Sequence, residues 1–206
     1  CEDILKRVKV SKDKISVIYN GYNRISEIPM QGMKEDYMIA VTSDLPHKNA
    51  EGIIRAYEKY CSKTDKPLQL RIIGIADVAQ YHLSQNVENN IICYKYIESN
   101  EEMHHMIAAA KIFLFLSLIE GFGFPPIEAM QLGTPVVCSE FSSLPEVVGD
   151  AAILVDPCEP DETAEALIKL QNDENKQQEL IAKGYHNVER FSWDSTAARY
   201  AEIIMK

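Results

Sequence analysis

The chain has 206 residues, of which 46% are hydrophobic and 25% are charged. These are ordinary values for a globular protein, and the length suits one large domain or one domain plus part of another. The formal net charge of −10 argues against a nucleic-acid partner, because phosphate backbones are bound by clustered lysine and arginine.

The cysteine content favours a reducing compartment. There are five cysteines with no C-x-x-C pair, an arrangement that fits neither a disulfide framework nor a zinc site. No apolar stretch approaches the roughly 20 residues that span a bilayer, and no secretory signal precedes the first strand. We therefore expect a cytoplasmic protein, with the inner face of the membrane as an alternative location for its full-length form. Because the sequence begins at Cys1, we expect a fragment of a longer chain.

The first part of the chain is predicted to lie outside the main domain. Residues 15–19 are apolar and lead into the turn pair Asn20-Gly21, which predicts a short strand and a turn. Residues 22–36 are polar and typical of a linker. The expected division is therefore a tail of a preceding domain plus a linker over residues 1–33, and the main domain over residues 34–206.

From residue 37 onward, apolar runs alternate with amphipathic stretches. The runs predict strands at residues 37–41, 68–73, 91–93, 112–116, 135–138 and 152–155. Helices are predicted over residues 49–61, from Ser99, from Pro125-Pro126 to Gly133, and through most of 161–206 with Ser192 as the last N-cap. This alternation predicts an α/β fold with a doubly wound, Rossmann-like parallel sheet. In such sheets ligands bind beyond the carboxyl ends of the strands.

The segment after the most apolar strand has the residues of an anion site. Glu120 is followed by Gly121 and Gly123, which let the backbone approach a ligand closely, and then by a helix N-terminus. The prolines at 125 and 126 lack amide hydrogens. Phosphate contacts are therefore expected on the amides of residues 121–124, or on those of residues 127 and 128.

Glu128 lies in the predicted first turn of that helix. There the helix dipole favours a carboxylate by about 0.3–1 kcal/mol. Two interpretations stay open from the residues alone. Glu128 binds a ligand, or it only complements the dipole while the two glycines only form a turn.

Lys48 lies in the segment 46–49, between the first strand of the domain and its helix. A lysine in the first turn of a helix opposes the dipole, so an anion bound at the same helix end would explain it. The alternative is a solvated lysine whose ammonium turns away from the helix.

Residues 120–130 resemble a known motif. Seven residues separate the two glutamates, as in the E-x(7)-E motif of retaining glycosyltransferases of the GT-B fold, family four in particular. Further segments match in the family's order and spacing, at residues 17–21, 46–49, 112–116, 132–136, 142–147, 149–152 and 155–157. The resemblance covers about residues 15–206 and implies the C-terminal, nucleotide-sugar-binding half of a GT-B fold.

The resemblance also implies roles for individual residues. Glu128 would bind the donor ribose hydroxyls, Glu120 would lie beside the transferred sugar, and Lys48 would bind the donor phosphates and neutralise the leaving diphosphate. Lys48 and Glu120 are thus the catalytic candidates. The substrate-binding candidates are Ser43, Lys48, Tyr94, Lys95, Tyr96, Glu120, Gly121, Phe122, Gly123, Phe124, Glu128 and Leu144. The family implies no metal and no cofactor, since the donor itself is a nucleoside-diphosphate sugar.

Three features depart from the family pattern. Ser43 occupies a position where many relatives have arginine, and Lys95 one where many have glycine. The N-terminal domain, which would bind the acceptor, is not part of this sequence. We therefore expect the 206 residues alone to bind donor and to transfer nothing.

The leading hypothesis is a retaining glycosyltransferase that moves a hexose from a UDP, GDP or ADP sugar to a carbohydrate or lipid-linked acceptor. The reaction would proceed on one face of the sugar, and no enzyme nucleophile is obvious. Glu120 is an alternative nucleophile, but we expect it to position the sugar instead. A nucleotide-sugar epimerase or hydrolase of the same fold is one alternative, and a non-catalytic nucleotide-binding module is another.

Overall fold

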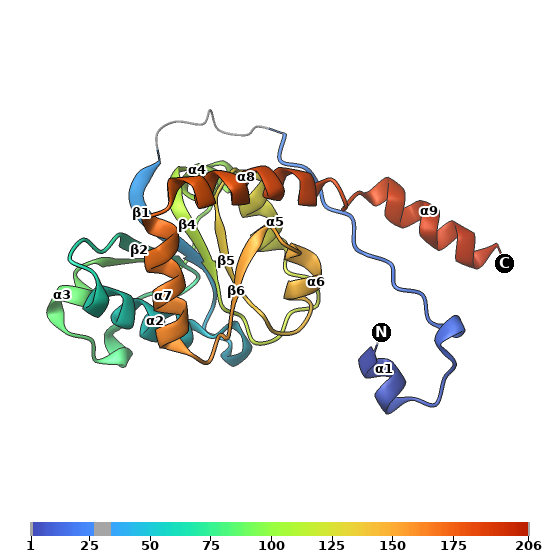
Figure 1. Ribbon diagram of the computed structural model, residues 1–206, viewed down its shortest axis with the longest axis horizontal. Coiled ribbons are helices and arrows are strands. Elements are labelled where there is room, and N and C mark those ends of the chain that lie inside the picture. Colours follow the sequence, from blue (N-terminus) through green and yellow to red (C-terminus); the bar gives the residue numbers. More distant parts are fainter. Residues whose placement is uncertain (1, 27–33, 206) are drawn as a thin grey trace. The chain divides into compact units, whose positions relative to one another are not determined.

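A computed structural model of the chain describes residues 2–26 and 34–205 (Figure 1). The described residues group into two units by their contacts. The larger runs from Ile25 to Val188 and holds the sheet. The smaller combines the residues up to Arg24 with those from Glu189 onward. The predicted division at residue 33 stays a prediction.

Within the described residues, the larger unit contains one sheet of six strands, all parallel. The strands are β1 (Glu35–Val41), β2 (Gln69–Ile73), β3 (Ile91–Tyr94), β4 (Ala110–Phe115), β5 (Val136–Ser139) and β6 (Ala152–Val155). Each lies within two residues of its predicted bounds. Their order is β3-β2-β1-β4-β5-β6, so the direction of winding reverses between β1 and β4. The predicted doubly wound α/β fold is confirmed.

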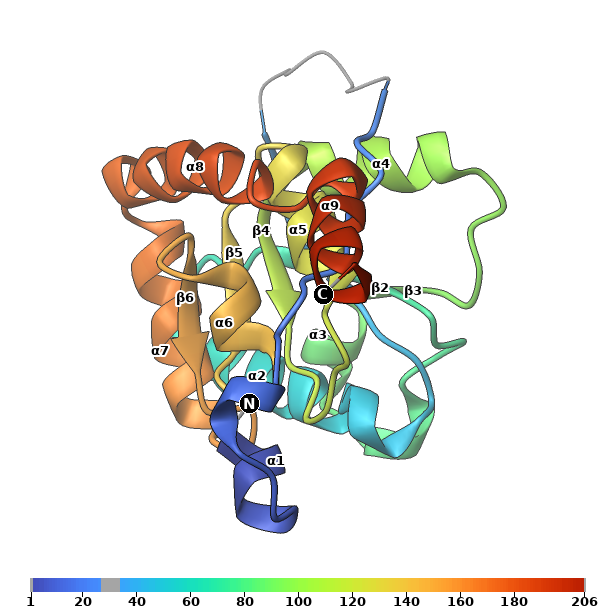
Figure 2. The same ribbon diagram turned by 90° about the vertical axis from the view of Figure 1, so that its right-hand side faces the viewer.

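Helices cover both faces of the sheet. They are η2 (Pro46–Lys48), α2 (Ala50–Lys63), η3 (Ala79–Tyr81), α3 (Gln85–Glu88), α4 (Asn100–Ala109), α5 (Phe124–Gln131), α6 (Leu144–Val148), α7 (Pro160–Gln171) and α8 (Glu174–Val188). Helices α2 and α7 pack together on one face. Figure 2 shows the unit from the side of α5 and α6, and α8 packs against α5. Alternate strand residues therefore face two different helical layers, which is why the strands read as continuous apolar runs.

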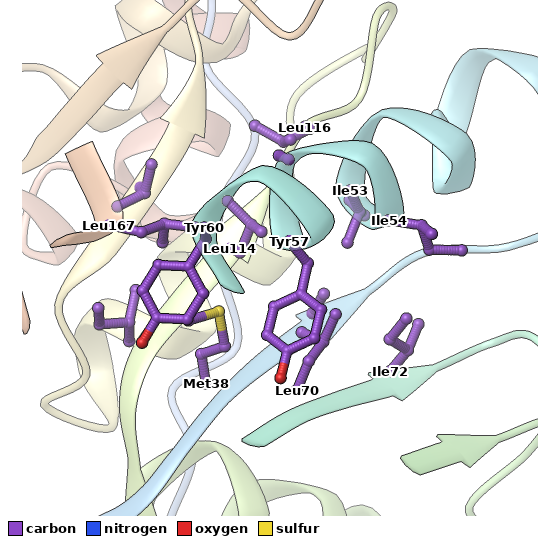
Figure 3. Packing of buried hydrophobic residues seen from close by; sticks show 14 of the residues in the cluster. Met38, Ile53, Ile54, Tyr57, Tyr60, Leu70, Ile72, Leu114, Leu116 and Leu167 are labelled. Atoms are coloured by element: carbon purple, nitrogen blue, oxygen red, sulfur yellow. The ribbon is translucent and has the colours of Figure 1, made fainter. Parts of the chain in front are cut away.

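The face under α2 carries the main hydrophobic core (Figure 3). Helix α2 begins after Asn49, whose side chain accepts a hydrogen bond from the Gly52 amide at 3.1 Å. Its apolar stripe buries Ile53, Ile54, Tyr57 and Tyr60 against Met38, Leu70, Ile72 and Leu114. The Tyr57 hydroxyl donates to the Leu68 carbonyl at 2.9 Å, so the buried phenol is satisfied. This layer fixes the α2 N-terminus against the carboxyl end of β1.

The smaller unit contains α1 (Glu2–Arg7), η1 (Lys12–Lys14) and α9 (Trp193–Ile204). The prediction of a strand at residues 15–19 was wrong, because this segment pairs with no other strand among the described residues. It is held to α9 by side chains instead, and the Thr196 hydroxyl donates to the Tyr19 carbonyl at 2.8 Å. The predicted N-cap is confirmed, since the Ser192 hydroxyl accepts from the Ser195 amide.

The predicted linker at residues 22–36 is shorter than expected. Its residues 27–33 lie outside the described part of the chain. Ile25 exchanges hydrogen bonds of 3.1 and 3.2 Å with the buried side chain of Gln131, and β1 already begins at Glu35. The polar composition predicted a linker, but a side chain holds Ile25 at one end and strand pairing begins at Glu35 at the other. No helix in the described parts of the chain is both long and apolar enough to cross a bilayer.

Candidate functional site

The candidate site lies where the winding of the sheet reverses. Lys48 ends η2 directly after β1, and Glu120 follows β4. Because β1 and β4 are neighbours, the loops after their carboxyl ends flank the topological switch point. In open α/β sheets this crevice is the usual place for a nucleotide.

One backbone hydrogen bond and the side chain of Asn49 hold these two loops together. The Leu118 amide donates to the His47 carbonyl at 2.8 Å. The Asn49 side-chain amide donates to the carbonyls of Leu116 and Pro157, both at 3.0 Å. Asn49 therefore ties the start of α2 to the end of β4, and it adopts the left-handed conformation, which asparagine tolerates better than most residues.

The two catalytic candidates form an ion pair. Lys48 Nζ lies 2.7 Å from Glu120 Oε1, and their side chains are 28% and 11% exposed. The Thr42 hydroxyl donates to the Lys48 carbonyl at 2.9 Å, which fixes the backbone that carries the lysine. The sequence assigned both residues to the donor site but did not predict that they pair. The sequence feature that could have indicated this pairing is that Lys48 and Glu120 each follow a strand predicted to be buried.

The glycine loop between β4 and α5 presents backbone donors. Within residues 2–26 and 34–205, the amides of Gly121 and Gly123 donate hydrogen bonds to no other residue. A Cβ at Gly121 would meet nothing within 4 Å, so this part of the loop is open. Gly123 has φ of 102°, and a Cβ there would lie 2.5 Å from the Leu144 side chain. The predicted anion-binding amides at these two glycines are thus available to a ligand.

Glu128 does not lie in the first turn of its helix, and that prediction was wrong. Helix α5 begins at Phe124, one residue before the two prolines, so Glu128 is its fifth residue. The Glu128 amide consequently falls within the helical hydrogen-bond ladder and is not a free phosphate donor. Ile127 is the fourth residue of the helix, and the expected phosphate contact of its amide stays a prediction. A dipole role for the Glu128 carboxylate loses its basis, because the effect fades beyond the first turn.

The Glu128 side chain is half-buried, and its carboxylate has no hydrogen-bond or ion-pair partner among the described residues. Burial raises the pKa of this carboxyl above its ordinary value. A half-buried carboxylate without a protein partner is less favourable for stability than a solvated one, and carboxyls with raised pKa values concentrate at functional sites.

The remaining candidates lie farther along the same edge of the sheet. Tyr94 ends β3, and its carbonyl accepts from the Gly74 amide at 2.8 Å. Tyr96 is 77% exposed in the loop that follows, with Lys95 between them. Among the described residues, no hydrogen bond or ion pair joins this loop to Lys48 or Glu120, and its role in base binding stays a prediction.

Ser43 lies in a neighbouring hollow of about 540 Å³. Arg55 and Tyr81 also line this hollow, whereas Lys48 and Glu120 do not. The Ser43 hydroxyl accepts a long hydrogen bond of 3.4 Å from the Leu45 amide. The structure therefore brings Ser43 near the loop of Lys48 but not into the ion pair.

The described residues contain no group of three histidine, cysteine, aspartate or glutamate side chains close enough to hold a metal ion. The profile of the family described as "Glycosyl transferases group 1" matches residues 23–187. The chain belongs to this family. The predicted resemblance is confirmed at this level.

Relatives in the family include named mannosyltransferases. The chain is 32% identical to O-antigen chain mannosyltransferase B of Escherichia coli over 78% of its own length and 43% of the relative's. It is 31% identical to MMP alpha-(1->4)-mannosyltransferase of Mycolicibacterium hassiacum, over 99% of its own length and 51% of the relative's. The chain thus spans about half the length of these relatives.

Solved structures of the GT-B type share the fold. A mutant of S. aureus TarM in complex with fondaparinux, alpha-GlcNAc-glycerol and UDP aligns with 98% of this chain and 41% of its own, with a TM-score of 0.82 and 22% identity. Sucrose-phosphate synthase of Thermosynechococcus elongatus aligns with 99% of this chain and 55% of its own, with a TM-score of 0.75 and 22% identity. At this identity the likeness shows the fold.

The resemblance named Leu144 of this group 1 domain as a substrate-binding candidate, but the sequence did not predict helix α6, which Leu144 begins. Leu144 is fully buried with its side chain against Gly123, so any contact with a donor would come from its backbone. Phe122 is also buried. The loop of Glu120 thus rests on the segment that begins α6.

Proposed function

We propose that this chain forms the nucleotide-sugar-binding domain of a retaining glycosyltransferase, which transfers a hexose to a carbohydrate or lipid-linked acceptor. The observation that carries the proposal is the Lys48–Glu120 ion pair at the switch point of the sheet. The two open glycine amides beside it and the unpartnered carboxylate of Glu128 support the same conclusion.

Lys48 is proposed to bind the donor diphosphate together with the amides of Gly121 and Gly123. In the free protein its ammonium pairs with Glu120. A bound diphosphate would compete for the ammonium and leave the Glu120 carboxylate available to the sugar hydroxyls. As the glycosidic bond breaks, negative charge grows on the diphosphate, and a preorganised cation then stabilises the transition state more than the ground state.

Glu128 is proposed to accept hydrogen bonds from the two ribose hydroxyls, which would supply the partners that its carboxylate lacks in the free protein. Lys48 and the loop amides would do the work that a divalent cation does in other sites, so we expect binding without metal and without a cofactor. Retention at the anomeric carbon is part of the proposal, with the acceptor attacking from the face that the diphosphate leaves.

We propose mannose as the transferred sugar, because both relatives quoted above are named mannosyltransferases. The acceptor would bind outside the 206 residues, since the chain spans about half the length of these relatives. Cys61, Cys93, Cys138 and Cys158 are free thiols, which suits action in the cytoplasm.

Calorimetry on the 206-residue chain in EDTA tests the donor site. GDP, UDP, GDP-mannose and UDP-glucose are titrated separately, and we expect one nucleotide and its sugar to bind. Binding that appears only on addition of a divalent ion contradicts the metal-free site, and binding of none of the four contradicts the proposed function.

Product analysis on the full-length protein distinguishes the reaction classes. Mass spectrometry of donor plus an oligosaccharide acceptor should show a glycosylated acceptor, and nuclear magnetic resonance should show an unchanged anomeric configuration. Free hexose alone indicates a hydrolase, an epimerised donor indicates an epimerase, and an unaltered donor indicates a binding module. Each of these three outcomes overturns the transferase.

A further inference from the structure

Glu120 is held at its backbone as well as at its carboxylate. The Ser142 hydroxyl donates to the Glu120 carbonyl at 2.9 Å and accepts from the Glu120 amide at 3.2 Å. The Ser142 side chain thus bonds to both the backbone amide and the backbone carbonyl of Glu120, which lies 22 positions away in the sequence. The geometry leaves Glu120 little freedom to rotate about its own backbone.

A second serine acts on the same loop. The Ser143 hydroxyl lies 3.0 Å from the Glu120 carbonyl and 3.1 Å from the Phe122 carbonyl, so its single proton is shared between them. Ser142 and Ser143, which we call the serine brace, therefore bind Glu120 and Phe122, the residues on either side of Gly121. Next to the brace, Leu144 fills the space beneath Gly123.

The backbone of the brace is strained in a way that turn formation alone does not require. Ser142 has φ of 62°, in the left-handed region that non-glycine residues seldom adopt. Glycine would fit that conformation without strain but has no hydroxyl to offer. The Ser142 hydroxyl makes two hydrogen bonds to Glu120 from this strained conformation. We infer that the strain is tolerated because it places the hydroxyl for these two bonds.

We propose that Ser142 and Ser143 are positioning residues for recognition of the donor sugar. They act through Glu120, whose carboxylate they hold at the place from which it pairs with Lys48 in the free protein and contacts the sugar in the complex. This inference rests on the proposed function of the donor site and deepens it. Neither serine touches the diphosphate in this scheme, so the brace serves the sugar rather than the nucleotide.

The scheme makes the two halves of the donor respond differently to loss of the brace. A loosened Glu120 contacts the sugar less well, and it also competes less well for the Lys48 ammonium. Binding of a nucleotide sugar should therefore weaken, while binding of the nucleoside diphosphate stays unchanged or tightens. A general loosening of the domain would weaken both.

The test compares Ser142→Gly and Ser143→Ala with Ser143→Thr, which keeps a hydroxyl. Dissociation constants are measured by calorimetry for GDP and GDP-mannose, or for UDP and UDP-glucose if the wild type prefers uridine. The ratio of the constant for the nucleotide sugar to that for the nucleoside diphosphate should rise about tenfold in the first two variants, as expected for loss of hydrogen bonds worth about one factor of ten. It should stay close to the wild-type ratio in Ser143→Thr.

The glycine substitution at position 142 distinguishes an effect on folding from an effect on the position of Glu120. Ser142→Gly relieves the left-handed strain, so its Tm should not fall below that of the wild type. In a Glu120→Ala background, Ser142→Gly should change the ratio no further, because the brace acts through that residue. A ratio that still rises in this background overturns the proposal.

Amide hydrogen exchange reports the brace without any donor. Exchange at Glu120 should accelerate in Ser142→Gly, since its amide loses an acceptor, while exchange in β1 stays constant. Unchanged exchange at Glu120 overturns the brace, and an unchanged ratio overturns the positioning role. Failure of the wild type to bind any nucleotide overturns the proposed function instead, and exchange distinguishes that result from a failure of the brace.

Discussion

Two groups of lysine–carboxylate pairs in the larger unit have different surroundings. Between α2 and α7, Lys63 Nζ lies 2.8 Å from Asp161 and 3.4 Å from Glu165, and all three side chains are at least one-third exposed. At the edge of the sheet, Lys48 and Glu120 are largely enclosed, and a backbone hydrogen bond from Leu118 to His47 joins the loops that carry them. Water screens the first group, and it screens the second far less.

The difference separates stabilisation from binding. The α2–α7 pairs lie over a complete hydrophobic core, and removing one leaves the fold with its main support. The edge pair includes Glu120, which directly precedes the open Gly121 amide, and we propose that an anionic ligand replaces one partner of this pair. The same chemistry therefore stabilises a helix surface weakly in one region and forms a candidate site in the other.

The largest effect expected is that of Lys48→Ala on turnover. The full-length protein should lose on the order of 10²–10³ in kcat, comparable to removing one preorganised donor from an active site. No arginine at position 43 shares the charge, because Ser43 stands there. Steady-state kinetics test this, with Lys63→Ala as the matched control. An unchanged kcat with a raised KM would make Lys48 a uniform binder and contradict its catalytic role.

The second effect is that of Glu128→Gln on nucleotide binding. A neutral amide accepts less strongly from two ribose hydroxyls, and a charge-assisted contact is worth about 1.5–3 kcal/mol. Calorimetry should show this weakening, with Glu165→Gln on α7 as the control. An unaltered affinity in a correctly folded variant would return Glu128 to a structural role.

The same substitution should raise stability at neutral pH. Burial raises the folded-state pKa of Glu128, so the folded protein binds a proton more tightly than the unfolded chain. Stability from this group is therefore greatest below the unfolded pKa and falls as pH rises through the folded one. Glutamine does not ionise, so the variant does not lose stability as the pH rises. Thermal denaturation at pH 7 should therefore give a higher Tm for the variant than for the wild type. A lower Tm would mean that the carboxylate has a stabilising partner.

Gly121 and Gly123 of the loop differ in the space around them and in their backbone conformation. At Gly123 any other residue must adopt φ of 102° and displace the Leu144 side chain, so Gly123→Ala should lower stability by about 1–3 kcal/mol. Gly121→Ala meets open space and is the matched control. Urea denaturation measures both variants. Equal stability of the two would show that the left-handed turn is not required.

The sequence predicted the sheet well and the site only in part. Continuous apolar runs identify strands buried on both faces, which is why β4 and β1 were found within two residues. The pair between Lys48 and Glu120 spans 72 positions and depends on strand order, which periodicity does not contain. Helix α5 begins one residue before the predicted start near Pro125-Pro126, and this shift is enough to place Glu128 beyond the first turn. The strand predicted at residues 15–19 failed because apolarity alone does not supply a pairing partner.

The smallest effect is expected for Lys63→Ala, which tests whether the exposed pairs between α2 and α7 contribute little to stability and nothing to binding. Pairing with Asp161 raises the pKa of Lys63, and pairing with Lys63 lowers the pKa of Asp161. A carboxyl whose folded pKa is depressed contributes stability above its unfolded pKa and loses it as pH falls through the folded value. The contribution is thus present at pH 7, but exposure and salt screening keep it small. Thermal denaturation should show a Tm change of less than about 3 °C in low salt, shrinking further in 1 M salt. The nucleotide affinity of Lys63→Ala should not change, because neither Lys63 nor Asp161 lies near the switch point of the sheet. A loss of affinity comparable to that of Lys48→Ala would mean that charge anywhere on this unit governs binding, and the distinction between the two regions would be wrong.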